Sequence, residues 1–240
     1  MNILALEASA KAASCCVCRD EFLLAQSYQH SGLTHSRTLL PMVEDLLKNS
    51  ELSMDDIDLV AVANGPGSFT GLRIGVSAAK GLAWARDLPC AACSTLESMA
   101  WNLAHLEGAD LCCAMDARRS QVYAARFVIQ NGQPVRLRED EAISVAQLAD
   151  EVKNRKKPQI LVGDGWELCY NEFTGCSLPC DLAPPHLRYP SAWGVARCGL
   201  ELARRGGLTT AAALSPAYHR LSQAERERLE REQQTHKQEN

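Results

Sequence analysis

Residues 64–75 of the chain read NGPGSFTGLRIG. The four glycines and one proline of this stretch follow the apolar run 59–63 directly, and a segment with helical character continues to about residue 85. A strand that runs into a glycine-rich loop and then into a helix is a common place for a protein to hold a phosphate group. The first question is therefore whether this loop binds a nucleotide or has its glycines for another reason.

The two best-known phosphate-binding loops do not match this stretch. A P-loop requires Gly-Lys followed by Ser or Thr, and no such sequence follows Gly71. The spacing from Gly65 through Gly67 to Gly71 is one residue longer than the dinucleotide fingerprint, and no acidic residue stands at the required distance beyond it. The glycines therefore need a second explanation.

The helix after the loop suggests close packing. Gly75, Ala79 and Ala83 follow one another at intervals of four, so one stripe of this helix has almost no side chain. The earlier helix, residues 34–48, has an apolar arc wider than one core-facing stripe needs. We predict that these helices form a partner or dimer interface, although both could simply cover their own sheet. The predicted interface residues are Leu39, Leu40, Val43, Leu47, Leu72, Gly75, Val76, Ala79 and Ala83.

An internal repeat predicts the fold. The first half reads as strands at 3–6, 12–17 and 22–28, a helix at 34–48, a strand at 59–63, the glycine loop and a helix at 71–85. The second half repeats this order from residue 111, with an Asn131-Gly132 hairpin turn and a capping box at 144–147. We predict an α/β protein with the duplicated two-lobe fold of actin, Hsp70 and sugar kinases, the ASKHA fold.

The repeat also predicts the division of the chain. The N-terminal lobe, residues 1–106, is expected to carry the partner-binding helices, and the C-terminal lobe spans residues 107–222. The last helix of the second lobe, 191–205, is expected to pack back on the first lobe. Residues 223–240 form a charged tail with a single leucine, expected to be frayed or disordered.

Residual nucleotide contacts are expected where the two lobes face each other. The first strand of each half ends on an acidic residue, and this is where the architecture positions metal and water. The turns at 8–11 and 117–120 contain no glycine, so a complete phosphate clamp is not expected. No His-Glu-x-x-His spacing is present, and no catalytic residue is assigned. The candidate nucleotide contacts are Glu7, Gly65, Pro66, Gly67, Ser68 and Asp116.

Composition excludes several classes of protein. A net charge of −4 and a pI near 5.9 argue against a chain that coats nucleic acid by itself. The sequence shows neither a basic leader nor an 18-residue apolar span, so a cytoplasmic protein without membrane attachment is expected. The eleven cysteines read as small core residues of a reducing compartment. Cys90-x-x-Cys93 is an incomplete metal spacing, so no metal site is predicted.

Several stretches together resemble the TsaB (YeaZ) family. They cover most of the chain: HSRTLLPMVEDLL (35–47), GPGSFTGLRIGVSAAKGLA (65–83), STLESMA (94–100), MDARRSQVYAARF (115–127) and SPAYHRLSQAER (215–226). The resemblance implies a non-catalytic subunit for synthesis of N6-threonylcarbamoyladenosine (t6A) at position 37 of tRNAs that read ANN codons.

The resemblance also implies partners. TsaD, a paralogue of the same fold, transfers the threonylcarbamoyl group, and TsaB pairs with it through the first lobe. The ATPase TsaE joins them, a threonylcarbamoyl-AMP synthase supplies the activated group, and tRNA is reached through the complex. Without TsaD the family forms homodimers through the same surface. No cofactor of its own is implied, while ATP or ADP at the interface of the complex stays open.

The non-catalytic role is supported by what the motifs lack. TsaD carries a metal-binding His-x-x-x-His pair where this chain has residues 95–99, TLESM. Many relatives begin their first turn with Asp-Thr-Ser, whereas this chain has Glu7-Ala8-Ser9. The alternative is an actin-like ATPase or a peptidase-like enzyme that is active by itself.

Overall fold

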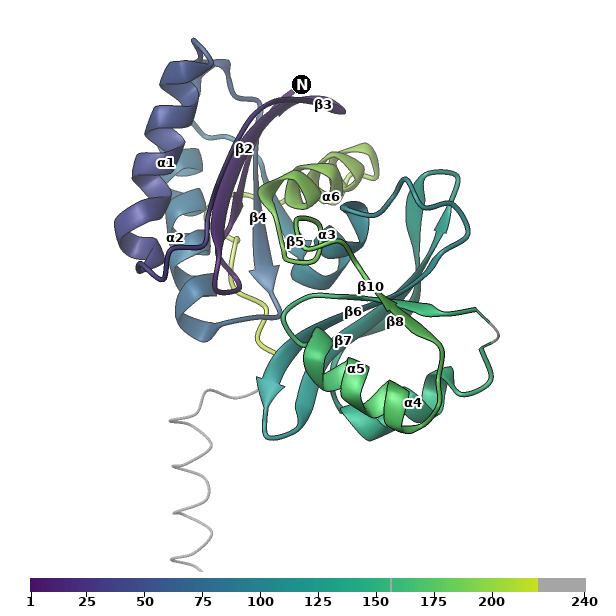
Figure 1. The fold of residues 1–240 in the computed structure, drawn as a ribbon. Helices are drawn as coiled ribbons and strands as arrows, with labels where there is room; N and C mark the ends of the chain where they lie inside the picture. The colour runs from purple at the N-terminus through teal and green to yellow at the C-terminus, as the bar shows by residue number, and fades with distance from the viewer. Residues whose placement is uncertain (156, 220–240) are drawn as a thin grey trace, which may run out of the picture.

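A computed structural model describes residues 1–155 and 157–219 of the chain. Its architecture consists of two five-stranded sheets, each with helices on both faces (Figure 1). The two sheets have equivalent strand orders, β3-β2-β1-β4-β5 and β8-β7-β6-β9-β10 when the second is read from its β8 edge. The predicted internal duplication is therefore present in the structure.

The first sheet contains β1 (Asn2–Glu7), β2 (Ala13–Arg19), β3 (Phe22–Gln29), β4 (Leu59–Gly65) and β5 (Cys90–Ser94). β1 pairs with β2 in the antiparallel and with β4 in the parallel sense, so buried strands with near-continuous apolar runs occupy the centre. One face is covered by α1 (His35–Asn49) and α2 (Phe69–Trp84), and the 3₁₀ turn η1 (Met54–Asp56) leads into β4.

The second sheet contains β6 (Asp110–Arg118), β7 (Gln121–Gln130), β8 (Gln133–Ser144), β9 (Gln159–Val162) and β10 (Cys180–Leu182). One face is covered by α4 (Val145–Val152) and α5 (Trp166–Gly175). The predicted capping box begins α4: the Ser144 hydroxyl accepts the Gln147 N–H, and the Gln147 side chain accepts the Ser144 N–H.

Two helices tie the lobes together by packing on opposite sheets. α3 (Thr95–Trp101) follows β5 directly but packs on the second sheet. α6 (Ala192–Arg204) follows the second sheet but packs on the first, and it also contacts α3 (Figure 1). The division into residues 1–106 and 107–222, with the last helix returning to the first lobe, therefore describes the two sheets and the position of α6 but not the packing of α3 on the second sheet. The predicted tail, residues 223–240, lies outside the described residues.

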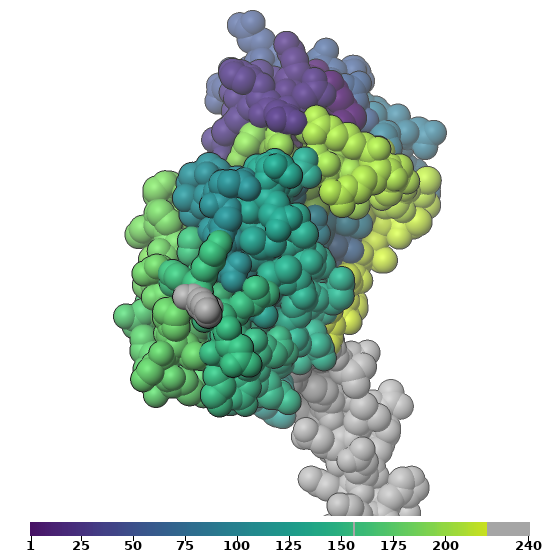
Figure 2. All heavy atoms as spheres, turned by 90° about the vertical axis from the view of Figure 1, so that its right-hand side faces the viewer, coloured from purple at the N-terminus to yellow at the C-terminus, as the bar shows by residue number. Residues whose placement is uncertain are grey.

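A C-terminal strap, residues 209–219, also lies on the first lobe. Thr209 pairs with Cys90 at the β5 edge, and the Lys80 ammonium donates to the carbonyl oxygens of Ala212 and Leu214, both at 3.1 Å. Asn64 then exchanges two hydrogen bonds with the strap, accepting the Ala217 N–H at 2.7 Å. In Figure 2 the yellow residues that follow α6 lie alongside the blue residues of the first lobe.

The glycines of the loop between β4 and α2 sit where other backbone segments come close. A Cβ at Gly65, whose φ is +145°, would overlap the carbonyl oxygen of Ala217 in the strap. A Cβ at Gly67 would lie 2.6 Å from the carbonyl oxygen of Ser9, and one at Gly71 would overlap that of Ala8. The loop is therefore the point at which the β1–β2 turn, α2 and the strap meet.

The cysteines are mostly core residues. Nine of the eleven are buried, and all eleven are free thiols. Burial raises the pKa of Cys15 to about 12, so this thiol stays protonated at neutral pH and behaves as a small apolar side chain.

Two glycines on the same helix provide a matched test of this packing. Gly71→Ala places a methyl group against the Ala8 carbonyl, so we expect the free energy of unfolding to fall by about 3 kcal/mol. At Gly81 no heavy atom lies within 4 Å of an added Cβ, so Gly81→Ala should raise it by about 0.5–1 kcal/mol through helix propensity. Urea denaturation measures both. Equal effects of the two substitutions would contradict the close approach at Gly71.

Candidate functional site

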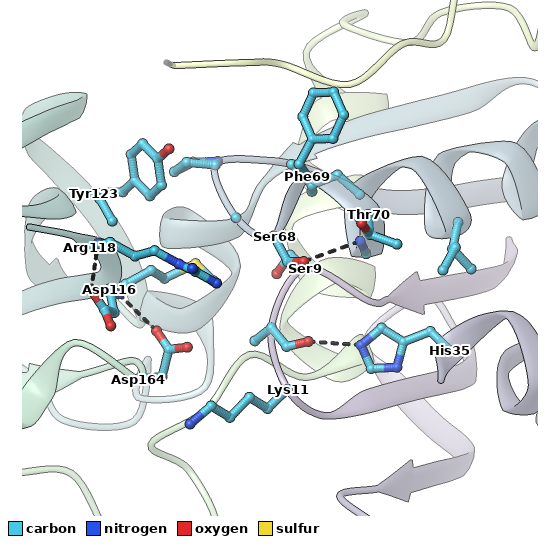
Figure 3. Close-up of a pocket in the computed structure, with 18 of the residues that line it drawn as sticks. Ser9, Lys11, His35, Ser68, Phe69, Thr70, Asp116, Arg118, Tyr123 and Asp164 are labelled. Carbon is cyan, nitrogen blue, oxygen red and sulfur yellow. Dashed lines mark hydrogen bonds between the residues drawn. The ribbon is translucent and has the colours of Figure 1, made fainter. Parts of the chain in front are cut away.

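A cleft of about 870 Å³ lies between the two lobes (Figure 3). Its first-lobe wall comes from the β1–β2 turn, the β3–α1 loop and the start of α2, and its second-lobe wall comes from the end of β6, β7 and Asp164. The end of the strap, residues 217–219, lies at its edge. This volume is within the range of small-molecule sites.

Glu7 does not line this cleft, in contrast to its prediction as a nucleotide contact. Its side chain is 1% exposed, and one carboxylate oxygen accepts both the N–H and the hydroxyl of Ser9, each at 2.5 Å. The other oxygen has no hydrogen-bond partner among the described residues. Burial raises the pKa of Glu7 to about 7, and the two bonds from Ser9 only partly oppose that shift. Glu7 therefore holds the β1–β2 turn in place from inside the lobe.

The glycine loop reaches the cleft with some of its backbone donors already used in internal packing. Pro66, Gly67 and Ser68 line the cleft, whereas Gly65 faces the strap. The Ser68 N–H donates to the carbonyl oxygen of Ser9 at 2.7 Å, and the Ser68 hydroxyl accepts the Gly71 N–H as the N-cap of α2. Packing against the β1–β2 turn thus occupies the amide that would otherwise face a phosphate group.

Asp116 does line the cleft, together with Asp164, which sequence reasoning missed. Asp164 accepts the Asp116 N–H at 3.0 Å, and Asp116 accepts the Arg118 N–H at 2.6 Å. Burial raises the pKa of Asp164, while the nearby charge of Lys11 acts in the opposite direction. The Gly163-Asp164-Gly165 sequence after β9 was the available signal for Asp164, because it repeats the position of the first-lobe glycine loop.

A metal centre is not assembled within residues 1–155 and 157–219. No group of three or more His, Cys, Asp and Glu side chains is placed there to hold an ion. Within the same residues, no helix has both the length and the apolar character needed to cross a membrane.

The predicted interface requires a correction. Eight of its nine residues are buried, because the small-residue stripe of α2 packs on its own sheet: a Cβ at Gly75 would lie 3.3 Å from that of Ala8. The alternative, in which both helices cover their own sheet, is right for these eight, and only Leu40 is exposed, at 48%. The buried residues are Leu39, Val43, Leu47, Leu72, Gly75, Val76, Ala79 and Ala83.

A second small-residue stripe of α2 faces outward. Ser77 and Gly81 are exposed, and Ile74 and Ala78 beside them are half-buried. Trp84, at the end of the helix, is 66% exposed. The sequence contained the signal: Leu72 and Val76 mark the core-facing side, so the stripe that shares their side is buried and the one opposite is free.

Comparison with known proteins gives a consistent result. Residues 29–174 match the family model described as TsaD, tRNA N6-adenosine threonylcarbamoyltransferase. The chain is 32% identical over 236 residues to the tRNA threonylcarbamoyladenosine biosynthesis protein TsaB of Bacillus subtilis (strain 168), covering 96% of this chain and 99% of that protein. The protein of the same name from Escherichia coli (strain K12) is 34% identical over 169 residues, 70% of this chain and 73% of that protein.

Solved structures are similar over nearly the whole chain. YeaZ from Pseudomonas aeruginosa matches with a TM-score of 0.77 and 26% identity, covering 90% of this chain and 99% of that one. Component A of the (R)-2-hydroxyglutaryl-CoA dehydratase of Acidaminococcus fermentans matches with a TM-score of 0.50 and 12% identity, which is a likeness of fold alone. The predicted two-lobe actin-like fold is confirmed.

Glu7 generates a pH-dependent prediction. The pKa of Glu7 is raised from 4.5 to about 7 in the folded chain, so the protonated carboxyl group favours folding. Its contribution to the free energy of unfolding is fully present below pH 4.5 and is lost as the pH rises through about 7. Gln cannot ionise, so between pH 4.5 and 7 the free energy of unfolding of Glu7→Gln should rise relative to that of the wild type by about 3 kcal/mol. Urea unfolding at a series of pH values measures the difference, with Glu44→Gln on the exposed side of α1 as control. A difference independent of pH would show that Glu7 is not a buried titrating group.

Proposed function

The chain belongs to the TsaB family, and we propose that within the synthesis of t6A in tRNA it acts as a non-catalytic subunit. Its relatives of that name and the TsaD family match support a role in t6A synthesis. The modified nucleoside would lie at position 37 of tRNAs that read ANN codons. A role on tRNA is consistent with a cytoplasmic location.

The single observation that carries the non-catalytic role is the content of α3. In the resemblance to TsaD, this segment takes the place of the metal-binding histidine pair. Here it holds no histidine, and Thr95, Ser98 and Met99 are all fully buried between the lobes. A catalytic metal centre needs ligand side chains beside an open coordination position, and these residues of α3 offer neither, so α3 is a packing element in this chain.

We propose that TsaD binds the exposed face of α1 and α2. That face offers Leu40 on α1 and the outward stripe of α2, where Ser77 and Gly81 would let a partner helix approach closely. The same face would support a homodimer when TsaD is absent. TsaE would join the pair, the threonylcarbamoyl-AMP synthase would act before it, and tRNA would be bound through the complex.

We propose that any ATP or ADP binds between subunits of the complex rather than within this chain. The packing of Ser68 against Ser9 and the burial of Glu7 argue against a complete phosphate site inside the monomer. ATP or ADP would therefore bind at the interface between subunits, and this chain would have no cofactor of its own. The alternative of an independent ATPase or peptidase receives no support from a metal site, because the described residues contain no group of three or more His, Cys, Asp and Glu side chains that could hold an ion.

Reconstituted tRNA modification tests the proposed role. With TsaD, TsaE and the adenylate-forming enzyme present, omitting this chain should abolish t6A, because the transferase lacks its partner. Mass spectrometry of digested tRNA gives the readout. Modification by this chain and the adenylate-forming enzyme without TsaD would identify it as a transferase and overturn the proposal.

A second experiment tests the docking face. Gly81→Leu adds bulk at an open, exposed helical position, so the monomer should stay folded while TsaD co-elution on size exclusion falls at least about tenfold. Gly175→Leu is the matched control, because it is also a helical glycine with open space around an added Cβ but lies in the second lobe. Unchanged co-elution of the Gly81 variant would place TsaD on another surface. Gly75→Leu is unsuitable, because it fills the core.

A further inference from the structure

Aromatic side chains from both lobes flank the upper part of the cleft, and cations lie below them. Figure 3 shows Tyr123 of β7 on one wall and Phe69 of α2 on the other, with the Arg118 guanidinium between the walls and Lys11 lower down. Neither the Arg118 guanidinium nor the Lys11 ammonium forms an ion pair with another residue in the described ranges. Both cations therefore line the cleft together with the aromatic side chains and without a direct ion pair among the described residues, although Asp116 and Asp164 line the same cleft and the charge of Lys11 acts on Asp164.

The carboxylates of the cleft build the turn that carries Arg118. Asp164 accepts the Asp116 N–H, and Asp116 in turn accepts the Arg118 N–H. Arg118, Arg119 and Ser120 then have φ values of +64°, +55° and +57°. Positive φ at Arg119 and Ser120 is the geometry of a two-residue hairpin turn between β6 and β7, and Arg118, paired with Gln121, adds a third left-handed residue just before it. This turn directs the Arg118 side chain across the cleft (Figure 3).

The aromatic wall of the first lobe is also held rigidly. The Phe69 and Tyr218 rings stack with centroids 4.9 Å apart, and the Arg73 guanidinium lies 3.9 Å from the Phe69 centroid. Arg73 donates to the Tyr218 hydroxyl at 2.9 Å, which ties α2 to the strap. Phe69 therefore stays at the mouth of the cleft, and Tyr218, 45% exposed, extends the aromatic surface outward.

The arrangement suits a nucleic-acid strand better than a free nucleoside triphosphate. A triphosphate needs several converging backbone donors, but the Ser68 amide is already bonded to Ser9 and no P-loop lysine is present. A single strand carries one charge per nucleotide and unstacked bases, and proteins bind it with separated cations and aromatic platforms. The net charge of −4 limits non-specific attraction, so binding must come from these local groups.

We propose that the cleft between the lobes binds an unpaired segment of RNA, with a base against Phe69 or Tyr123 and the adjoining phosphates on Lys11 and Arg118. The inference rests on the proposed role in tRNA modification and extends it, because it gives this subunit its own contact with the RNA substrate. The RNA would enter the cleft at its edge, where the two lobes and the end of the strap, residues 217–219, lie together.

Fluorescence anisotropy with a labelled unmodified tRNA transcript tests the proposal, using the full chain in its complex with TsaD. Lys11→Gln and Arg118→Gln should each weaken binding about fivefold and lower the slope of log affinity against log salt by about one. Arg118→Lys should retain that slope. Arg86→Gln is the control: it removes an exposed arginine at the far end of α2, where Arg86 pairs with Asp55, and should change neither quantity.

Three outcomes overturn the RNA site. Equal effects of the Arg86 and Arg118 variants would show only general charge attraction, and unchanged binding by both cleft variants would place the RNA elsewhere. Displacement of the tRNA by millimolar ATP, with loss of ATP binding in the cleft variants, would identify a free nucleotide as the ligand. Failure of the RNA site and failure of the proposed function can be told apart. The proposed function is tested by whether t6A forms when this chain is omitted, and the RNA site is tested by the binding of the cleft variants.

Discussion

The hydrogen bond from the Ser68 N–H to the Ser9 carbonyl oxygen fixes the arrangement on which the rest of the first lobe depends. It joins the glycine loop to the β1–β2 turn, and this approach is only open to a loop without side chains at residues 67 and 71. The strap closes over the same loop from the other side, through Asn64 and the contact of Ala217 with Gly65. The β1–β2 turn, the glycine loop and the strap, which are distant in sequence, therefore meet at the peptide groups of the glycine loop.

The bond between the glycine loop and the β1–β2 turn reduces the number of backbone amides that can face a ligand in the cleft. In a two-lobe fold of this kind, the loop and the turn face the cleft, so a loop that is bonded to the turn presents fewer amides to a ligand. Glu7 contributes from inside, since its carboxylate is used to hold Ser9. The cleft itself persists, with Lys11, Arg118 and aromatic side chains as its main chemical groups. The proposed role beside an enzyme is consistent with a cleft in which the Ser68 amide is used for internal packing.

Much of the fold was predictable from the sequence, because strands and turns have local signals. The alternating and apolar runs located most strands, Asn131-Gly132 marked the β7–β8 hairpin, and the repeat gave the duplication. The segment 90–101 was not resolved into β5 and α3, since residues buried on all sides show neither helical nor strand periodicity. The return of α6 to the first lobe was expected, whereas the packing of α3 on the second sheet was not, because it is a matter of tertiary contacts.

The candidate site was harder to predict than the fold. The small-residue stripe at Gly75 indicated close packing correctly, but the pattern alone does not say whether the neighbour is the chain's own sheet or a partner. Asp116 was predicted in the cleft, whereas Asp164 and Arg118 become site residues only through the turn that their hydrogen bonds build. Tyr218 reaches the cleft because the strap crosses the glycine loop. No local sequence pattern predicts that the strap packs back on the first lobe in this way.

The most direct test of the packing role of the glycine loop is an NMR measurement on the Ser68 amide. Its proton should exchange slowly with solvent, because it is bonded to the buried Ser9 at its carbonyl oxygen, although Ser68 itself is exposed at the cleft. Addition of magnesium and ATP to the isolated chain should leave the Gly67 and Ser68 resonances unchanged. A fast-exchanging Ser68 amide, or a shift of both resonances on adding ATP, would contradict the account and restore the loop as a phosphate site.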